Sequence, residues 1–339
     1  MIEIQGKSFL CERKWIILRA VVIGASGHVG SYMVPELVKK GYEVVAISRG
    51  TRLPYTGHQP EWKKVKTVSA DRKALEKGKT FGSFVMSFEP DVVLDLICYT
   101  KAQAVELAEA AMEYGKLLHL IQIGSIWAYG KSVYRPYREE YPRRPLGSYG
   151  KGKAEIEEYL LGLTKLHKLT CTVIHPGHIC GEGWWPINPQ GNPDTKVFED
   201  IANGREIIIP NDGLATLNHV HSYDIAALAI RCLDRPSASA GEAFTSVCPE
   251  GMTLEGYAEE MFIKFGKEPK IRKVPFEQFK NFVGDENAAI TYDHISKSLV
   301  CSMDKAYRHL GFVPKYDALA TVGEAVDWQV RNGFLKIEK

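Results

Sequence analysis

The chain has 339 residues, of which 45% are hydrophobic and 25% charged, and its formal net charge is +2. This composition is typical of a globular protein with a large core, and the near-neutral charge gives no reason to expect nucleic acid as a partner. No apolar run is long enough to span a bilayer, and residues 1–17 lack the apolar stretch of a secretory signal, so we expect neither a membrane protein nor a secreted one.

The seven cysteines form no Cys-x-x-Cys pair, and their number is odd. Such usage favours neither a disulfide framework nor a zinc knuckle, but a reducing compartment. We therefore expect a cytoplasmic protein.

After an N-terminal extension over 1–17, a strand and a glycine-rich turn open the folded part. An apolar run at 18–23 predicts a buried strand, glycines follow at 24, 27 and 30, and 31–38 predicts a helix. Free backbone N–H groups and the positive end of the helix dipole then face one point, and the glycines let a pyrophosphate approach the backbone. The alternative is a glycine-rich turn that binds no ligand.

Strands and helices alternate through the following 140 or so residues. The pattern predicts strands at 43–48, 65–68, 91–97, 117–123 and 170–174, with helices at 101–114 and 149–167. This alternation predicts right-handed crossovers and an α/β fold with a doubly wound parallel sheet of the Rossmann type. Ligands bind such a sheet beyond the carboxyl ends of its strands.

The alternation of strands and helices ends at residue 177, where irregular sequence rich in Gly, Pro and Trp begins. Residues 219–234 read as a strand and a helix that return to the first domain. Further helices are predicted near 253–266, 276–282, 303–310 and 320–332. We therefore expect a dinucleotide-binding domain over 18–176 with 219–234, and a smaller, interleaved C-terminal substrate lobe made by 177–218 and 235–339.

Tyr149 and Lys153 lie four residues apart, on one face of the predicted helix 149–167. A lysine ammonium near a phenol favours the phenolate, so we expect the pKa of Tyr149 to fall below its usual value of about 10. Tyr149 could then exchange a proton with a substrate hydroxyl or carbonyl while a nicotinamide takes or gives hydride. Ser125 follows the strand 117–123 and could hydrogen-bond the reacting oxygen; its alternative role is that of a turn residue.

The glycine turn, Ser125 and the Tyr149-Lys153 pair follow one another along the chain as they do in the extended short-chain dehydrogenase/reductase family. The sequence therefore resembles this family, which includes sugar-nucleotide epimerases and dehydratases. The resemblance covers roughly residues 18–330. Beyond the glycine turn, Ser125 and the Tyr-Lys pair, it rests on Asp71, Tyr129-Gly130, Glu140, His175-Pro176-Gly177, His221-x-x-Asp224 and Leu310-Gly311-Phe312-x-Pro314.

The resemblance implies a catalytic triad of Ser125, Tyr149 and Lys153, with Lys153 also holding the nicotinamide ribose. It implies that the cofactor contacts the glycine turn at Gly24, Ser26, Gly27, His28, Val29 and Gly30, and also Asp71, Arg72, Leu96, Ile97, Lys153 and Pro176. It also implies a homodimer through helices 101–114 and 149–167. The alternative is that the apolar faces of these helices only pack on the sheet.

Two departures from the family pattern restrict which reaction and which cofactor we expect. Ile126-Trp127 stands where 4,6-dehydratases carry an acid and a base, so we do not expect dehydration by that route. The second strand ends in Ser48-Arg49 without the carboxylate that binds the ribose hydroxyls of NAD. A 2′-phosphate would pair with Arg49, so we predict NADP(H) as the preferred cofactor, with NAD(H) as the alternative.

The third departure concerns the substrate. Leu217 stands where family members that bind a nucleotide diphosphate have an arginine, and no arginine shortly precedes Asp304, where the family has a second one. Whether the substrate carries a nucleotide diphosphate is therefore left open. Lys196, Arg205 or Arg272 could compensate. Aromatic and histidine side chains suit a sugar ring, and the expected substrate residues are Trp127, Tyr129, His178, Trp184 and His219. No metal is expected, because no cysteine or carboxylate cluster accompanies the histidines.

We therefore expect an NAD(P)-dependent epimerase or carbonyl/alcohol oxidoreductase that acts on a small molecule, a sugar or a sugar-nucleotide-like substrate. The alternative is a non-catalytic dinucleotide-sensing or RNA-binding protein on the same fold. The presence of both Tyr149 and Lys153 and the near-neutral charge favour the enzyme.

Overall fold

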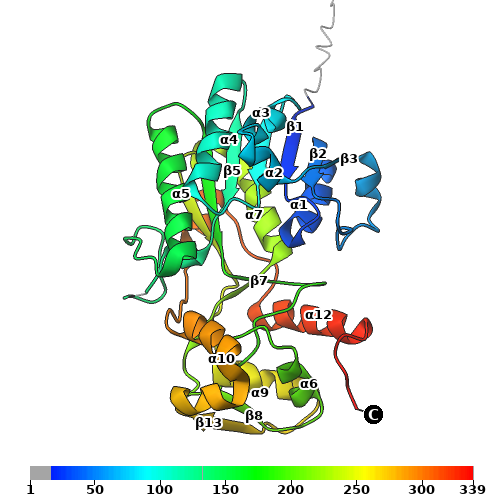
Figure 1. The fold of residues 1–339 in the computed structure, drawn as a ribbon, viewed down its shortest axis with the longest axis vertical. Coiled ribbons are helices and arrows are strands. Elements are labelled where there is room, and N and C mark those ends of the chain that lie inside the picture. The colour runs from blue at the N-terminus through cyan, green and yellow to red at the C-terminus, as the bar shows by residue number, and fades with distance from the viewer. Residues whose placement is uncertain (1–16, 132, 339) are drawn as a thin grey trace, which may run out of the picture.

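A computed structural model describes residues 17–131 and 133–338 (Figure 1). The predicted N-terminal extension lies outside the described residues except for Ile17. Figure 1 shows a sheet flanked by helices in the upper body and a smaller lobe below it.

A seven-stranded sheet forms the core of the upper body, in the order β11-β6-β5-β4-β1-β2-β3 with every neighbouring pair parallel. Its strands are β1 (Arg19–Ile23), β2 (Glu43–Ser48), β3 (Lys66–Ser69), β4 (Val92–Asp95), β5 (His119–Ile123), β6 (Cys171–Pro176) and β11 (Ala243–Ser246). The order runs outward from β1 in both directions, so the predicted doubly wound α/β sheet is confirmed.

Helices cover both faces of the sheet because its central strands are apolar on both sides. In β1, Ala20 and Val22 pack on one face, and Val21 and Ile23 pack on the other. The first face is covered by α1 (His28–Lys39), α7 (Ser222–Asp234) and α11 (Asp304–Leu310), and the second by α3 (Phe81–Met86), α4 (Lys101–Tyr114) and α5 (Gly147–Lys165). Short helices α2 (Arg72–Lys77) and α8 (Pro236–Ser239) connect these elements.

The segment 235–339, which the sequence assigned to the substrate lobe, contains β11, α8 and α11 of the sheet domain. β11 pairs with β6, Ala243 opposite Val173, and extends the sheet by one strand. Ala306 and Leu310 of α11 are buried in the same core cluster as β1 and α7. The sequence concealed β11 because it has only four residues, Ala-Phe-Thr-Ser, without an alternating or continuous apolar pattern.

The lower lobe is built from three small strand pairs and four helices. The pairs are β7 (His178–Cys180) with β10 (His219–His221), β8 (Ile207–Pro210) with β13 (Ile271–Val274), and β9 (Thr216–Leu217) with β12 (Met252–Thr253). The helices are α6 (Lys196–Ala202), α9 (Leu254–Lys264), α10 (Phe276–Ile295) and α12 (Ala318–Arg331). Phe198, Phe262 and Val326 centre a separate apolar core.

Helix α10 is longer than the predicted segment 276–282. The chain kinks at Gly284, whose φ of 77° is left-handed, and the helix then continues to Ile295. None of the helices in the described part of the chain combines the length and the apolar character that crossing a bilayer would require. The six cysteines between Cys98 and Cys301 are free and buried.

Candidate active site

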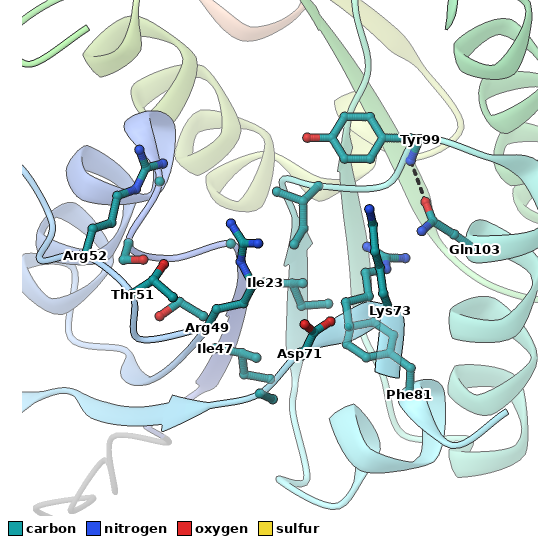
Figure 2. A pocket seen from close by; sticks show the side chains of 17 residues that line it. Ile23, Ile47, Arg49, Thr51, Arg52, Asp71, Lys73, Phe81, Tyr99 and Gln103 are labelled. Atoms are coloured by element: carbon teal, nitrogen blue, oxygen red, sulfur yellow. Dashed lines mark hydrogen bonds between the residues drawn. The ribbon is translucent and has the colours of Figure 1, made fainter. Parts of the chain in front are cut away.

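A cavity of about 330 Å³ lies at the carboxyl ends of β1, β2 and β3 (Figure 2). The expected cofactor residues that line it are Gly24, Ser26, Gly27, Ser48, Arg49, Asp71, Arg72 and Ile97. Those that do not line it are His28, Val29, Gly30, Leu96, Lys153 and Pro176. The sequence did not single out five polar lining residues, Thr51, Arg52, Lys73, Tyr99 and Gln103.

The glycine turn has the geometry of an anion site. Gly24 has a φ of 87°, and a Cβ there would lie 2.8 Å from Ile97. A Cβ on Gly30 would lie 2.4 Å from the carbonyl oxygen of Ala25, so this glycine lets α1 approach the turn closely. Helix α1 begins without a side-chain cap, which leaves the amides of its first turn for an anionic ligand. These features fit the pyrophosphate of a dinucleotide.

His28 supports this turn from behind. Its ring is buried and stacks on Trp184 of the lobe, with ring centroids 4.8 Å apart and an interplanar angle of 16°. The lobe therefore contacts the glycine turn directly.

The rim of the cavity beyond β2 is cationic. Arg49, Arg52 and Lys73 all line it, and Figure 2 shows Arg49 lying between the other two. Among the described residues that line the cavity, Asp71 carries the one carboxylate, and its Oδ1 caps α2 by accepting from the N–H of Ala74 at 3.3 Å. This rim therefore presents three cationic side chains and one carboxylate to a ligand.

Arg72 is held rigidly at the floor of the cavity. Its Nη1 donates to both carboxylate oxygens of Asp95, at 2.8 and 2.9 Å, and its Nε donates to Glu76 at 2.5 Å. Its buried Nη2 has no hydrogen-bond partner in the described part of the chain. This orphaned donor suits an acceptor atom on a bound ligand.

The predicted triad comes together where β5 ends and α5 begins. Ser125 caps a short 3-10 turn, Ile126–Ala128, with its Oγ accepting from the N–H of Trp127 at 3.2 Å. Tyr149 stands in the first turn of α5, and it lines the same cavity as Ser125. Lys153 follows one turn later; its Nζ is buried and donates to the carbonyl oxygens of Cys98, at 2.7 Å, and Ile123, at 2.9 Å.

The expected lowering of the Tyr149 pKa is not what the structure shows. Burial raises the pKa of Tyr149 above 10, although the Ser125 hydroxyl opposes the shift. Burial also lowers the pKa of Lys153 to about 8. The Nζ of Lys153 lies 5.8 Å from the centre of the Tyr149 ring and bonds two carbonyls instead, so its charge is directed elsewhere. Sequence spacing placed the pair correctly but could not reveal these carbonyls.

A buried chain of polar and charged groups holds Ser125 from behind. The N–H of Ser125 donates to His175 Nδ1 at 3.0 Å, and His175 Nε2 donates to Glu157 at 3.0 Å. Glu157 accepts two further bonds from Arg143, at 2.9 and 2.5 Å. Burial alone would raise the pKa of Glu157, but His175 and Arg143 outweigh it and lower that pKa to about 2. The backbone of Ser125 is therefore fixed by an ionised network.

A second cavity, of about 230 Å³, opens beside Ser125 and Tyr149 and extends to the lobe. Three of the expected substrate residues line it, Trp127, His178 and Trp184, together with Pro176. His294 of α10 also lines it and was not predicted, because the sequence pattern ended that helix at residue 282. Among the described residues, no group of three or more His, Cys, Asp or Glu side chains could hold a metal ion.

The other two expected substrate residues, Tyr129 and His219, are structural. Tyr129 is completely buried, stacks on Tyr137 with centroids 4.5 Å apart, and its hydroxyl bonds Thr245 at 2.7 Å. His219 is also completely buried, pairs with His178 across β7 and β10, and its Nε2 donates to the carbonyl of Ile187 at 3.1 Å. Both lie one layer behind the cavity wall, a distinction that sequence proximity to the motif cannot make.

Comparisons with known proteins are consistent with this geometry. The sequence pattern described as the NAD dependent epimerase/dehydratase family matches residues 20–245. A UDP-glucose 4-epimerase of Streptococcus mutans is 23% identical, over 89% of this chain and 93% of that protein. The chloroplast stem-loop binding protein of 41 kDa b of Arabidopsis thaliana is 25% identical, over 94% of this chain and 81% of that protein.

A solved structure shares the fold. The crystal structure of a UDP-glucose 4-epimerase from Thermotoga maritima, with UDP-glucose, superposes with a TM-score of 0.72 at 18% identity. The match covers 93% of this chain and 99% of that one, so both the sheet domain and the lobe have counterparts there.

Proposed function

Since the chain belongs to the NAD-dependent epimerase/dehydratase family, within the extended short-chain dehydrogenases/reductases, we propose that it is an epimerase or a carbonyl/alcohol oxidoreductase. Hydride passes between a nicotinamide dinucleotide and a carbon of a sugar or sugar-nucleotide-like substrate. The observation that carries this proposal is the meeting of Ser125, Tyr149 and Lys153, with Ser125 and Tyr149 lining a cavity that extends to the lobe.

The residues divide the work of the reaction by position. The glycine turn and Arg49 would hold the dinucleotide, which would supply the hydride acceptor and, in its oxidised form, a positive charge that favours the phenolate. Tyr149 takes the proton from the substrate hydroxyl, or returns it to a carbonyl oxygen, at its phenolic oxygen. Ser125 donates its hydroxyl hydrogen to the same substrate oxygen. Lys153 uses two N–H groups on backbone carbonyls and keeps the third for the cofactor ribose.

Dehydration is not part of the proposed reaction. It needs a further acid and base next to Ser125, whereas Ile126 is buried and Trp127 presents an indole ring to the cavity. Neither side chain transfers protons at neutral pH.

The cationic rim supports NADP(H) over NAD(H) as the preferred cofactor. Replacing Arg49 by alanine should weaken NADP⁺ binding about tenfold, the loss of one charge-assisted contact, and leave NAD⁺ binding unchanged. Isothermal titration of both dinucleotides measures this, with Lys77→Ala at the far end of α2 as the control. Equal affinity of the wild type for NAD⁺ and NADP⁺ would refute the preference.

The proposed activity is tested with the purified protein and either dinucleotide. UDP-glucose and a set of free aldoses serve as probes, with absorbance at 340 nm reporting net hydride transfer and chromatography reporting an epimerised product. Epimerisation without a lasting absorbance change supports the epimerase, and a stoichiometric change supports the oxidoreductase. Neither signal with any probe would count against catalysis.

The similarity to a stem-loop binding protein favours one alternative, a non-catalytic RNA-binding protein. The assembled triad and the net charge of +2 favour the enzyme. A gel-shift with a structured RNA at physiological salt separates the two, because only the alternative requires salt-sensitive binding. We also propose a cytoplasmic location. We further propose a homodimer through α4 and α5, and light scattering measures its mass.

A further inference from the structure

The wall of the substrate cavity that faces Ser125 is formed by two neutral histidines. His178 on β7 and His294 on α10 meet edge to face, with ring centroids 4.8 Å apart. Among the described residues that line this cavity there is no carboxylate, lysine or arginine. The remaining walls are indole rings and aliphatic side chains, so the polar character of the cavity comes from hydroxyls and imidazoles.

Backbone contacts fix which nitrogen of His294 carries the proton. Its Nδ1 lies 2.8 Å from the carbonyl oxygen of Gly191 and 2.9 Å from that of Ile290. Carbonyl oxygens only accept hydrogen bonds, so Nδ1 must donate. Burial lowers the pKa of His294, which keeps the ring neutral. Nε2 then carries a lone pair, and it has no hydrogen-bond partner in the described part of the chain.

A buried hydrogen-bond network keeps the imidazole of His294 in the tautomer with its proton on Nδ1. The Nδ2 of Asn192 donates to Thr291 Oγ1 at 3.1 Å, and that hydroxyl donates to the carbonyl of Gln190 at 3.0 Å. Asn188 Oδ1 accepts from the N–H of Gln190 at 2.7 Å. These contacts tie the loop around Gly191 to α10, so the carbonyl that His294 bonds cannot turn away.

Lys297 lies against Trp127 but does not line this cavity. Lys297 Nζ lies 3.9 Å from the centre of the Trp127 ring and donates to the carbonyl of Asp293 at 2.6 Å. It lines a neighbouring cavity of about 710 Å³, together with Lys131. The cavity beside Ser125 therefore offers an anionic group no positive partner.

These observations define what His294 can bind. A lone pair attracts an O–H donor and repels the oxygens of a phosphate or carboxylate, and a volume of about 230 Å³ suits one sugar-sized ring. We propose that His294 Nε2 determines specificity by accepting a hydrogen bond from a hydroxyl of an uncharged pyranose-like ring held between Trp127 and Trp184. Any charged portion of a larger substrate lies in the neighbouring cavity. The inference rests on the proposed function for the identity of the cavity.

Two substitutions of His294 separate its two nitrogens. Asparagine keeps a donor near the Nδ1 position and removes the Nε2 acceptor, whereas glutamine places a polar atom near the Nε2 position. The NADP⁺-loaded protein is titrated with methyl glucopyranoside, methyl galactopyranoside, methyl xylopyranoside and UDP, by calorimetry. His58→Asn, at an exposed site, is the control.

We expect at least one pyranoside to bind, His294→Asn to weaken it about tenfold, and His294→Gln to stay within about threefold of the wild type. NADP⁺ affinity should be unchanged in both variants. Three results would each overturn the proposal. They are a pyranoside affinity of His294→Asn equal to that of the wild type, binding of UDP without binding of any pyranoside, and no binding of any of the four probes. Binding that depends on His294 without hydride transfer would instead overturn the proposed function and leave this inference standing.

Nitrogen NMR gives a readout that does not involve ligand. In protein labelled with ¹⁵N-histidine, the His294 signal is assigned by its loss in His294→Asn. It should report a proton on Nδ1, and a proton on Nε2 would overturn the proposal.

Discussion

Replacing Glu157 by glutamine tests whether the buried chain behind Ser125 is ionised. The pKa of Glu157 falls from 4.5 to about 2 on folding, because His175 and Arg143 outweigh its burial. At about 1.4 kcal/mol per unit, ionised Glu157 contributes about 3 kcal/mol to the free energy of unfolding at pH 7. Glu157→Gln should lose this amount, which lowers the urea midpoint by about 1 M for a protein with an m-value near 3 kcal/mol/M.

The pH dependence of this difference has a definite sign. The folded carboxyl binds its proton near pH 2 and the unfolded one near pH 4.5, so between these values the unfolded chain binds more protons. The contribution is complete above pH 4.5 and shrinks as the pH falls, to about 1.4 kcal/mol at pH 3. The difference between wild type and Glu157→Gln should therefore narrow on acidification.

Urea unfolding followed by tryptophan fluorescence at pH 7, 4 and 3 measures this difference. Glu158→Gln, exposed on the same helix, is the matched control and should follow the wild type. Equal midpoints for wild type and Glu157→Gln at pH 7, or a difference that does not change with pH, would refute the ionised network.

Two other substitutions address the catalytic pair. Tyr149→Phe should lower kcat at least a hundredfold, since it removes the proton donor and acceptor, and leave cofactor affinity within about twofold by calorimetry; retained turnover would contradict the assigned role. Lys153→Met removes a lysine whose pKa is about 8 when folded and 10.5 when unfolded, so between these values the unfolded wild type binds more protons and the wild type gains stability with rising pH. The free energy of unfolding of the wild type, measured with urea, should rise by up to about 3 kcal/mol relative to that of Lys153→Met between pH 8 and 10.5. Parallel pH profiles for the two proteins would rule this out.

The sequence was sufficient to predict the helices and strands whose own residues favour the structure that they adopt in the fold. Helix α4 has the predicted bounds because Thr100 and Gln103 form a capping box at its start and Gly115 ends it with a φ of 69°. The strands of the sheet centre were visible because they are continuous apolar runs. Local sequence could not reveal β11, whose four residues form a strand only through pairing with β6.

The site was predictable to the extent that one motif places its own side chains. Ser125, Tyr149 and Lys153 converge because the carboxyl end of β5 meets the first turns of α5. His294 comes from a helix more than 140 residues later, and it reaches the cavity through tertiary packing alone. Tyr129 was misassigned for the converse reason, because neighbours in sequence occupy different layers after the turn that follows Ser125.

The division of the chain between sheet and lobe also bears on mechanics. Successive segments leave the sheet after β6, return at α7, leave again after β11 and return at α11 before α12 completes the lobe. A wide opening motion about a single pivot would have to bend all these connections together, which makes such a motion costly. A single proteolytic cut at any one connection should consequently leave the two halves associated, because the other connections still join them.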